Sequence, residues 1–348
     1  MEPNSPGSQD GCSGRHGTGT RIGLARDELA AIAALYGLSE ITSVHEPRRG
    51  SGTSAKAVLT TATGRFLVKR RARSIDARRR FALAVHHELA ESGVPVASLL
   101  KTTLDGLSEV IIDPHAYDVC EWIDATAFDG SIGATADAGS VLARFHTVLA
   151  SSLSAAAPAR QEPQVSSLAA AAGARLGSTA GGVVKRLALG YADAARRVRD
   201  LGIAEWPGVV IHGDWHPGNV LFRGDRVVAV VDFDDCCLAP RTLDIANGAL
   251  QFSMDLRGGA ARAPGLDEQR CVAFCRGYEA ASESLISTAE ISALPWLMIQ
   301  SLVIEALSAI AAAGSLGSLD GPTALRIVDA QAAWMQREAD RLRTLLSG

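Results

Sequence analysis

This sequence of 348 residues lacks a large excess of charge of one sign, Cys-x-x-Cys pairs and the apolar segment of a signal peptide. The 34 Lys and Arg residues almost balance the 38 Asp and Glu residues, and the net charge of −4 gives no indication of nucleic-acid binding. None of the six cysteines forms a Cys-x-x-Cys pair, so we expect reduced thiols in a cytoplasmic protein. Residues 1–22 are polar and lack the apolar stretch of a signal peptide, and we expect this tail to be disordered.

A membrane span is not expected either. The longest apolar run, residues 293–313, contains Pro295, Gln300 and Glu305, which favours a buried helix over a membrane-spanning one. Hydrophobic residues still make up 47% of the chain, which is enough for a substantial core, and the length suggests two domains. We therefore expect a globular protein without a membrane or nucleic-acid partner.

The most informative segment is residues 209–222, which read Val-Val-Ile-His-Gly-Asp-Trp-His-Pro-Gly-Asn-Val-Leu-Phe. Its first three residues predict a short buried strand that leads into a loop carrying Asp214. Pro217 and Gly218 predict a turn that lets Asn219 point back toward Asp214. A second apolar run follows a predicted hairpin turn at residues 224–225 and ends at Asp232.

These two segments favour a phosphoryl-transfer site. Asp214, Asn219 and Asp232 match a His-x-Asp-x-x-x-x-Asn motif followed by Asp-Phe-Asp. Moving a phosphoryl group requires a carboxylate that accepts the acceptor's proton and oxygen ligands for Mg²⁺, all held rigidly. An Asp or Asn beside a Gly is often only part of a turn, but the two segments together favour the functional interpretation.

On these residues the chain resembles the aminoglycoside phosphotransferase and choline kinase superfamily, and most closely its type II homoserine kinase-like members. The resemblance rests on His212-Gly-Asp-Trp-His-Pro-Gly-Asn219 with Asp232-Phe-Asp234, and it covers about residues 29–310. It implies an α+β, bilobal, protein-kinase-like fold. A small N-terminal lobe with an antiparallel sheet and a helix would bind ATP, and a larger, mostly helical C-terminal lobe would carry the catalytic and acceptor-binding residues.

The resemblance also implies an activity and a set of roles. The γ-phosphoryl group of ATP would move to a hydroxyl group of a small molecule, with Asp214 as the base. Asn219 and Asp232 would hold Mg²⁺, and Lys69, in the strand-like run 66–69, would contact the α- and β-phosphates. We place the N-terminal lobe at residues 23–123 and the C-terminal lobe at residues 124–348, with the hinge at 121–124.

A Gly- and Ser-rich stretch, residues 48–54, precedes this strand and contains Ser51, Gly52 and Thr53. A hairpin there would let backbone N–H groups approach the nucleotide phosphates, although an ordinary exposed turn has the same composition. We therefore include these three residues among the candidate nucleotide-binding residues.

The helix expected at residues 76–92 departs from the family pattern. The resemblance implies a glutamate early in this helix that holds Lys69, but the chain has Ala82 there. Glu88 lies further along and on a different side of an ideal helix. Two alternatives are open: Glu88 pairs with Lys69 through a shifted helix, or Lys69 has no such partner.

The later part of the chain predicts helices, including one at 135–149 that carries His146, to which we assign a structural role. Asp244 would begin a helix and have a structural role, either capping that helix or bracing the catalytic loop. Glu279, Glu283 and Glu290 either line an acceptor pocket or face solvent. The sequence does not distinguish an amino alcohol, a sugar or an aminoglycoside as the acceptor, ATP from GTP, or a monomer from a homodimer. A nucleotide-binding pseudokinase or regulatory protein on the same fold is the alternative function.

Overall fold

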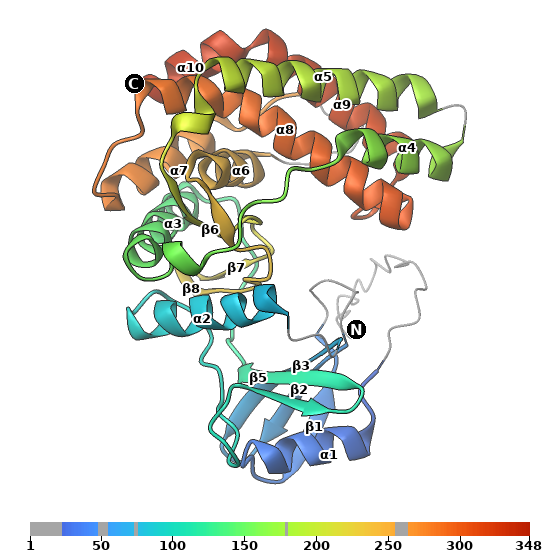
Figure 1. The fold of residues 1–348 in the computed structure, drawn as a ribbon, viewed down its shortest axis with the longest axis vertical. Helices are drawn as coiled ribbons and strands as arrows, with labels where there is room; N and C mark the ends of the chain where they lie inside the picture. Colours follow the sequence, from blue (N-terminus) through green and yellow to red (C-terminus); the bar gives the residue numbers. More distant parts are fainter. Residues whose placement is uncertain (1–22, 48–54, 73–75, 178–179, 255–263) are drawn as a thin grey trace, which may run out of the picture.

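An antiparallel sheet of five strands forms the N-terminal part of the molecule (Figure 1). The computed structural model describes residues 23–47, 55–72, 76–177, 180–254 and 264–348. The strands lie in the order β1 (Ile41–His45), β2 (Lys56–Thr61), β3 (Gly64–Ala72), β5 (His115–Glu121) and β4 (Glu109–Ile112). The predicted tail and the candidate residues Ser51, Gly52 and Thr53 lie outside the described residues.

Helix α1 (Arg26–Leu35) covers one face of this sheet. Leu29 and Ile32 of the helix and Phe66 and Val68 of β3 are buried in one apolar cluster. Because side chains alternate along a strand, Lys69 of β3 points to the opposite face. That face is turned toward helix α2 and the helical part of the molecule (Figure 1).

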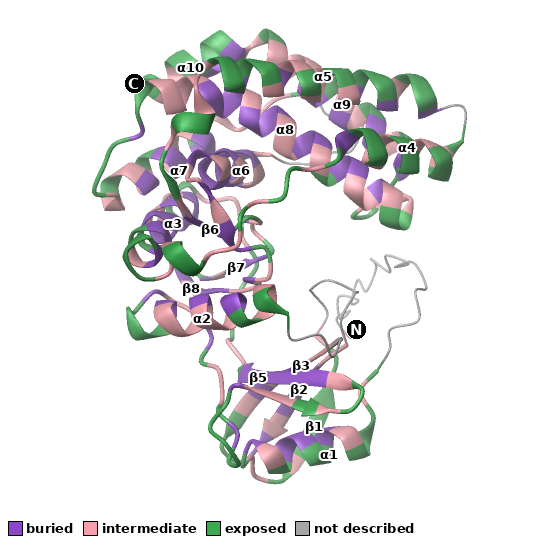
Figure 2. Cartoon of the chain, in the orientation of Figure 1, coloured by how far each residue is buried: buried purple, intermediate pink, exposed green. Residues whose placement is uncertain are grey.

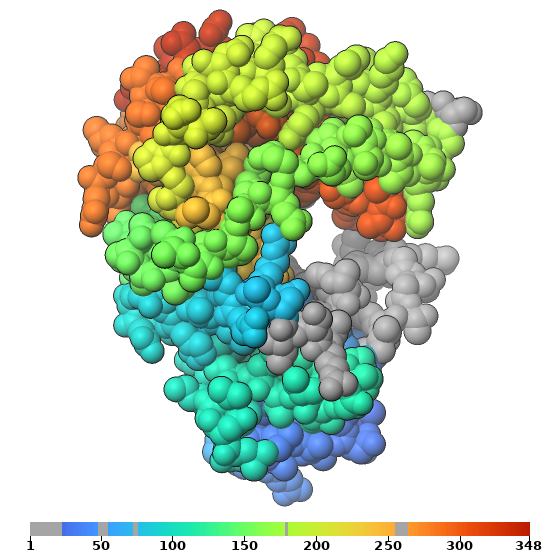
Figure 3. All heavy atoms as spheres, viewed as in Figure 1, coloured from blue at the N-terminus to red at the C-terminus, as the bar shows by residue number. Residues whose placement is uncertain are grey.

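Helix α2 (Ala77–Glu91) lies between the sheet and the helical part (Figures 1 and 3). It begins where the Asp76 carboxylate accepts the backbone N–H of Arg79 at 2.9 Å. Its buried residues, Phe81, Ala82, Val85 and Leu89, belong to the same apolar core as the C-terminal helices. This helix is therefore anchored on the helical part, although it precedes strands β4 and β5 in the chain.

The C-terminal part is mostly helical, and Figure 2 shows buried residues along its longest helix, α8. Its helices are α3 (Ile132–Ser152), α4 (Val165–Leu176), α5 (Gly181–Asp200), α6 (Thr242–Ser253), α7 (Glu268–Ala281), α8 (Thr288–Ala313), α9 (Gly321–Arg337) and α10 (Ala339–Ser347). Among the described residues α8 is the one helix long and apolar enough to cross a membrane. It packs against α4, α5, α6 and α9, as expected for a buried core helix. The α+β fold with an antiparallel N-terminal sheet is thus confirmed.

Helices α3 and α7 approach each other closely because each has a glycine at the contact. A Cβ atom on Gly139 of α3 would lie 2.1 Å from the carbonyl oxygen of Phe274. A Cβ on Gly277 of α7 would lie 2.0 Å from the carbonyl oxygen of Ala136. This crossing fixes α3 beside the strands that carry the candidate site.

Two short antiparallel pairs, inserted between α5 and α6, carry the candidate site. Strand β6 (Gly208–Ile211) pairs with β9 (Cys237–Pro240), and β7 (Val220–Arg223) pairs with β8 (Arg226–Val230). The turn predicted at residues 224–225 joins β7 to β8, and Gly224 has a φ of 58° there. The catalytic segment predicted from sequence therefore leaves β6 and enters β7, and the Asp-Phe-Asp segment follows β8.

Candidate active site

Asp214, the predicted base, lies on the loop between β6 and β7. Its Oδ2 atom accepts a hydrogen bond of 2.8 Å from Nδ2 of Asn219, which confirms that the turn brings these residues together. The same oxygen lies 3.3 Å from Nε2 of His216. Since Nδ1 of His216 accepts the backbone N–H of Gly218 at 3.0 Å, the neutral imidazole carries its proton on Nε2 and donates it to Asp214.

These contacts keep the Asp214 carboxylate ionised. Burial on its own would raise the pKa of Asp214, but the hydrogen bonds from His216 and Asn219 outweigh burial and lower it. Burial likewise opposes protonation of His216, yet Asp214 raises the pKa of the imidazole. A carboxyl group must be ionised before it can accept the proton of a hydroxyl group.

Asp244, at the start of α6, braces the loop from behind. Its carboxylate accepts the backbone N–H groups of His212 at 2.6 Å and Gly213 at 2.9 Å. It also contacts Nε2 of His146 at 3.1 Å, and Nδ1 of that histidine bonds to the Tyr278 hydroxyl at 2.9 Å. The structural roles predicted for Asp244 and His146 are confirmed by this buried chain of contacts.

The two predicted metal ligands have the chemistry that Mg²⁺ prefers. Nδ2 of Asn219 donates to both the backbone oxygen and the carboxylate of Asp214, so its amide oxygen is the atom left over for a cation. Backbone bonding ties the two segments together, because the N–H of Val231 donates to the carbonyl of Asn219 at 3.0 Å. Asp232, the next residue, has a φ of 72°.

In the part of the chain that is described, no group of three or more His, Cys, Asp or Glu side chains could hold a metal ion by itself. An amide and a carboxylate oxygen are instead two ligands of the kind that leave room for phosphate oxygens and water around Mg²⁺. The donor set therefore fits a metal that arrives with a nucleotide.

Lys69 lies on β3, on the sheet face opposite α1, as the alternation predicts. Lys56 of β2, which is not among the predicted site residues, is the direct cross-strand partner of Lys69 and shares this face. Burial, and then the charge of Lys69, lower the pKa of Lys56, while Asp232 is near enough to raise it. Lys56 and Lys69 thus lie side by side on the same sheet face.

Glu88 does not contact Lys69 in this structure. It is half-buried on α2, and Lys69 forms no ion pair with any described carboxylate within 4.0 Å. The pairing of these two residues stays a prediction. The α2 side chain that contacts the sheet is Arg79, which donates to Glu109 of β4 and Asp118 of β5.

Some acidic residues of the C-terminal helices have structural partners, and another lies near the catalytic loop. Glu290 forms an ion pair with Arg241 at 2.8 Å, and Glu279 accepts the backbone N–H of Ile286 at 3.1 Å, so both have structural partners. Glu305 of α8, which the sequence reasoning did not single out as a site residue, accepts from the Gln251 side chain and is close enough to raise the pKa of His216. Its spacing from residue 214 gave no signal, because α8 reaches the loop only in the folded protein.

Comparison with known proteins gives a consistent result. The sequence profile of the "Phosphotransferase enzyme family" matches residues 45–283. No curated protein sequence matches the chain significantly.

Solved structures of low sequence identity share the fold. An aminoglycoside phosphotransferase from Alicyclobacillus acidocaldarius is 18% identical with a TM-score of 0.63, over 90% of this chain and 96% of that one. An amicoumacin kinase in complex with AMP-PNP and Ca²⁺ is 16% identical with a TM-score of 0.66, over 90% of this chain and 92% of that one. A microcompartment-associated aminopropanol kinase is 15% identical with a TM-score of 0.66, over 90% of this chain and 98% of that one.

Proposed function

Because the chain belongs to the phosphotransferase enzyme family, we propose that it moves the γ-phosphoryl group of ATP to a hydroxyl group of a small molecule. The observation that carries the proposal is the Asp214 carboxylate, held ionised by Asn219 and His216 on a loop that Asp244 braces. Such a group is preorganised to accept a proton without moving, which is how a protein assists phosphoryl transfer.

Each residue has one role in this proposal. Asp214 accepts the proton of the acceptor hydroxyl, Asn219 and Asp232 offer oxygen ligands to Mg²⁺, and Lys69 contacts the nucleotide phosphates. When bound, Mg²⁺ would neutralise the charge on the phosphate oxygens. The boundary between the nucleotide-binding and acceptor-binding lobes falls at residues 123–124, just after the last strand of the sheet ends at Glu121.

The acceptor would approach Asp214 from the side of α6 and α8. Glu305, Gln251 and His216 lie there and offer acidic and polar side chains. These groups suit an amino alcohol, a sugar or an aminoglycoside. Two proteins of similar fold are named as an aminoglycoside phosphotransferase and an aminopropanol kinase. These names support an acceptor of this class but do not distinguish its members.

The proposal is tested by Asp214→Asn, which keeps the shape of the side chain and removes the base. We expect kcat to fall about 10²–10⁴-fold, the usual contribution of a general base. The acceptor is first found by measuring ATP consumption against amino alcohols, sugars and aminoglycosides. Binding of Mg²⁺·AMP-PNP to the variant should stay near that of the parent, because Asp214 is not assigned to the nucleotide. Turnover close to that of the parent would remove Asp214 from the mechanism.

A nucleotide-binding pseudokinase is the second candidate, because no described carboxylate pairs with Lys69 within 4.0 Å. The two functions differ in one measurement. A parent protein that binds Mg²⁺·AMP-PNP but consumes no ATP with any acceptor in the panel would favour the pseudokinase.

A further inference from the structure

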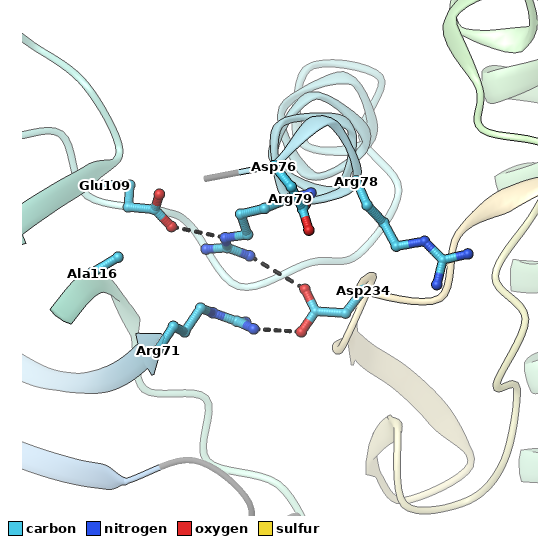
Figure 4. A pocket seen from close by; sticks show the side chains of 7 residues that line it. All are labelled: Arg71, Asp76, Arg78, Arg79, Glu109, Ala116 and Asp234. Carbon is cyan, nitrogen blue, oxygen red and sulfur yellow. Dashed lines mark hydrogen bonds and ion pairs between the residues drawn. The ribbon is translucent and has the colours of Figure 1, made fainter. Parts of the chain in front are cut away.

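Five charged side chains gather on the sheet face that carries Lys69. This group, which we call the interlobe charge cluster, consists of Arg71, Arg79, Glu109, Asp118 and Asp234. All but Asp118 also line a cavity of about 210 Å³ between the sheet, α2 and the segment after β8 (Figure 4). The cluster joins five elements: β3, α2, β4, β5 and the segment after β8.

Arg79 is the centre of this cluster. Its Nε donates to Oε2 of Glu109 at 2.8 Å, and one terminal nitrogen donates to Oδ2 of Asp118 at 2.5 Å. The other terminal nitrogen reaches Asp234 at 3.4 Å (Figure 4). One guanidinium from α2 therefore contacts β4, β5 and the segment that carries Asp232, which only the planar fork of an arginine can do.

Asp118 lies directly opposite Lys69 in the antiparallel pairing of β3 and β5. Directly paired residues share a sheet face with their Cβ atoms about 5 Å apart. The Asp118 side chain is only 5% exposed. Burial would raise its pKa, but the charges of Arg71, Arg79 and Lys69 outweigh burial and hold it below its usual value.

Helix α2 has no carboxylate on the side that faces Lys69. Ala82, where the family pattern has a glutamate, is 3% exposed and packed into the core of the helical part. Glu88 is nine residues from Arg79, and at about 100° per residue the two lie on opposite sides of the helix. When Arg79 faces the sheet, Glu88 faces away from it.

We propose that Asp118, whose carboxylate lies beyond 4.0 Å from the Lys69 ammonium group, is the acid whose charge positions Lys69 for the nucleotide phosphates. Arg79 is then a positioning residue that holds Asp118 in place. This arrangement reverses the one that the family pattern implies. The acid comes from strand β5 and the supporting cation from helix α2. Formally the cluster has two positive and three negative side chains, and the ammonium group of Lys69 balances the remaining charge. This inference rests on the proposed function, because it assigns Lys69 to the nucleotide.

The inference is tested by calorimetric titration of Mg²⁺·AMP-PNP into the parent, Arg79→Met and Arg79→Lys. Loss of a supporting contact around a binding group usually costs about 10–100-fold, and we expect Arg79→Met to weaken nucleotide binding by that factor. Arg79→Lys keeps a charge but not the fork, so its loss should be smaller. Glu88→Gln and Arg80→Met, which change a half-buried and an exposed residue of the same helix, should stay within about twofold. Thermal unfolding of every variant identifies those that are folded, and Asp118→Asn replaces Arg79→Met if the latter is unfolded.

A coupling measurement separates positioning from simple stabilisation. If Arg79 acts through Lys69, adding Arg79→Met to Lys69→Met should cause no further loss of affinity. Independent, multiplicative losses, or a folded Arg79→Met with parental affinity, would overturn the inference while leaving the proposed function intact. A Glu88→Gln loss equal to that of Lys69→Met would also overturn it. If the parent itself does not bind Mg²⁺·AMP-PNP, the proposed function fails, and the inference fails with it.

Discussion

Asp232 is a predicted metal ligand and also has an unfavourable backbone conformation. Substitutions at this residue can test the two properties separately. Among the described residues it is the one non-glycine residue with a positive φ, at 72°. A Cβ in this left-handed region costs about 1–2 kcal/mol because it crowds the following carbonyl oxygen, and glycine avoids this cost. The conformation lets the next residue, Phe233, enter the core at 5% exposure while Asp232 stays half-buried.

The perturbation is a pair of variants, Asp232→Gly and Asp232→Ala. Both remove the carboxylate, so electrostatic and metal effects cancel between them, and only the Cβ atom differs. We expect Asp232→Gly to be more stable than Asp232→Ala by about 1–2 kcal/mol. In a protein of 348 residues about 1 kcal/mol corresponds to roughly 1–2 °C in Tm, so the difference is measurable by calorimetry or circular dichroism.

A second pair at a helical position serves as the control. Asp193 lies in the middle of α5, with its side chain 33% exposed. There Asp193→Ala should be more stable than Asp193→Gly by about 1 kcal/mol, because glycine has the poorer helix propensity. The order of the two substitutions therefore reverses between the sites. Equal stability of the two Asp232 variants, or a more stable alanine variant, would refute the strain argument.

The same variants test the metal assignment. In both variants the dependence of nucleotide affinity on Mg²⁺ should be weaker than in the parent, since both lack the carboxylate oxygen. Titration with AMP-PNP at several Mg²⁺ concentrations measures this. A strong Mg²⁺ dependence retained in both variants would show that Asp232 is not a ligand, whatever their relative stabilities.

Local patterns in the sequence were sufficient for much of the site. The run at residues 66–69 predicted the strand that carries Lys69, and Pro217 and Gly218 predicted the turn that brings Asn219 to Asp214. The turn after β7 is equally local, because residues 224–225 determine it. In each case the interacting residues are within about ten positions of one another, where turn chemistry and periodicity act.

The interlobe charge cluster was beyond local reasoning. Arg79 and Asp234 are 155 positions apart, and their contact depends on how α2 packs between the two parts of the molecule. Local patterns do not show which of the three consecutive arginines 78–80 faces the sheet. The family resemblance implied an acid from the helix, whereas the acid directly opposite Lys69 comes from β5.

Two further predictions concern stability. Gly139→Ala should destabilise the protein by about 2 kcal/mol or more in denaturant unfolding, because the new methyl group would meet the Phe274 carbonyl oxygen at 2.1 Å. Gly173→Ala in α4, where nothing lies within 4 Å, should instead stabilise it by about 1 kcal/mol, and the reverse order would contradict the close α3–α7 contact. The ion pair with Arg241 predicts a pH effect: burial raises the pKa of Glu290, but the bond from Arg241 outweighs it and lowers the pKa from 4.5 to about 2. A depressed pKa gives stability that is complete above about pH 4.5 and is lost as the pH falls toward 2, worth at most about 3 kcal/mol at neutral pH. Glu290→Gln should therefore lower the unfolding free energy at pH 7 and flatten its decline between pH 4.5 and 2, and a variant with the parent's acid profile would show that the pair contributes nothing.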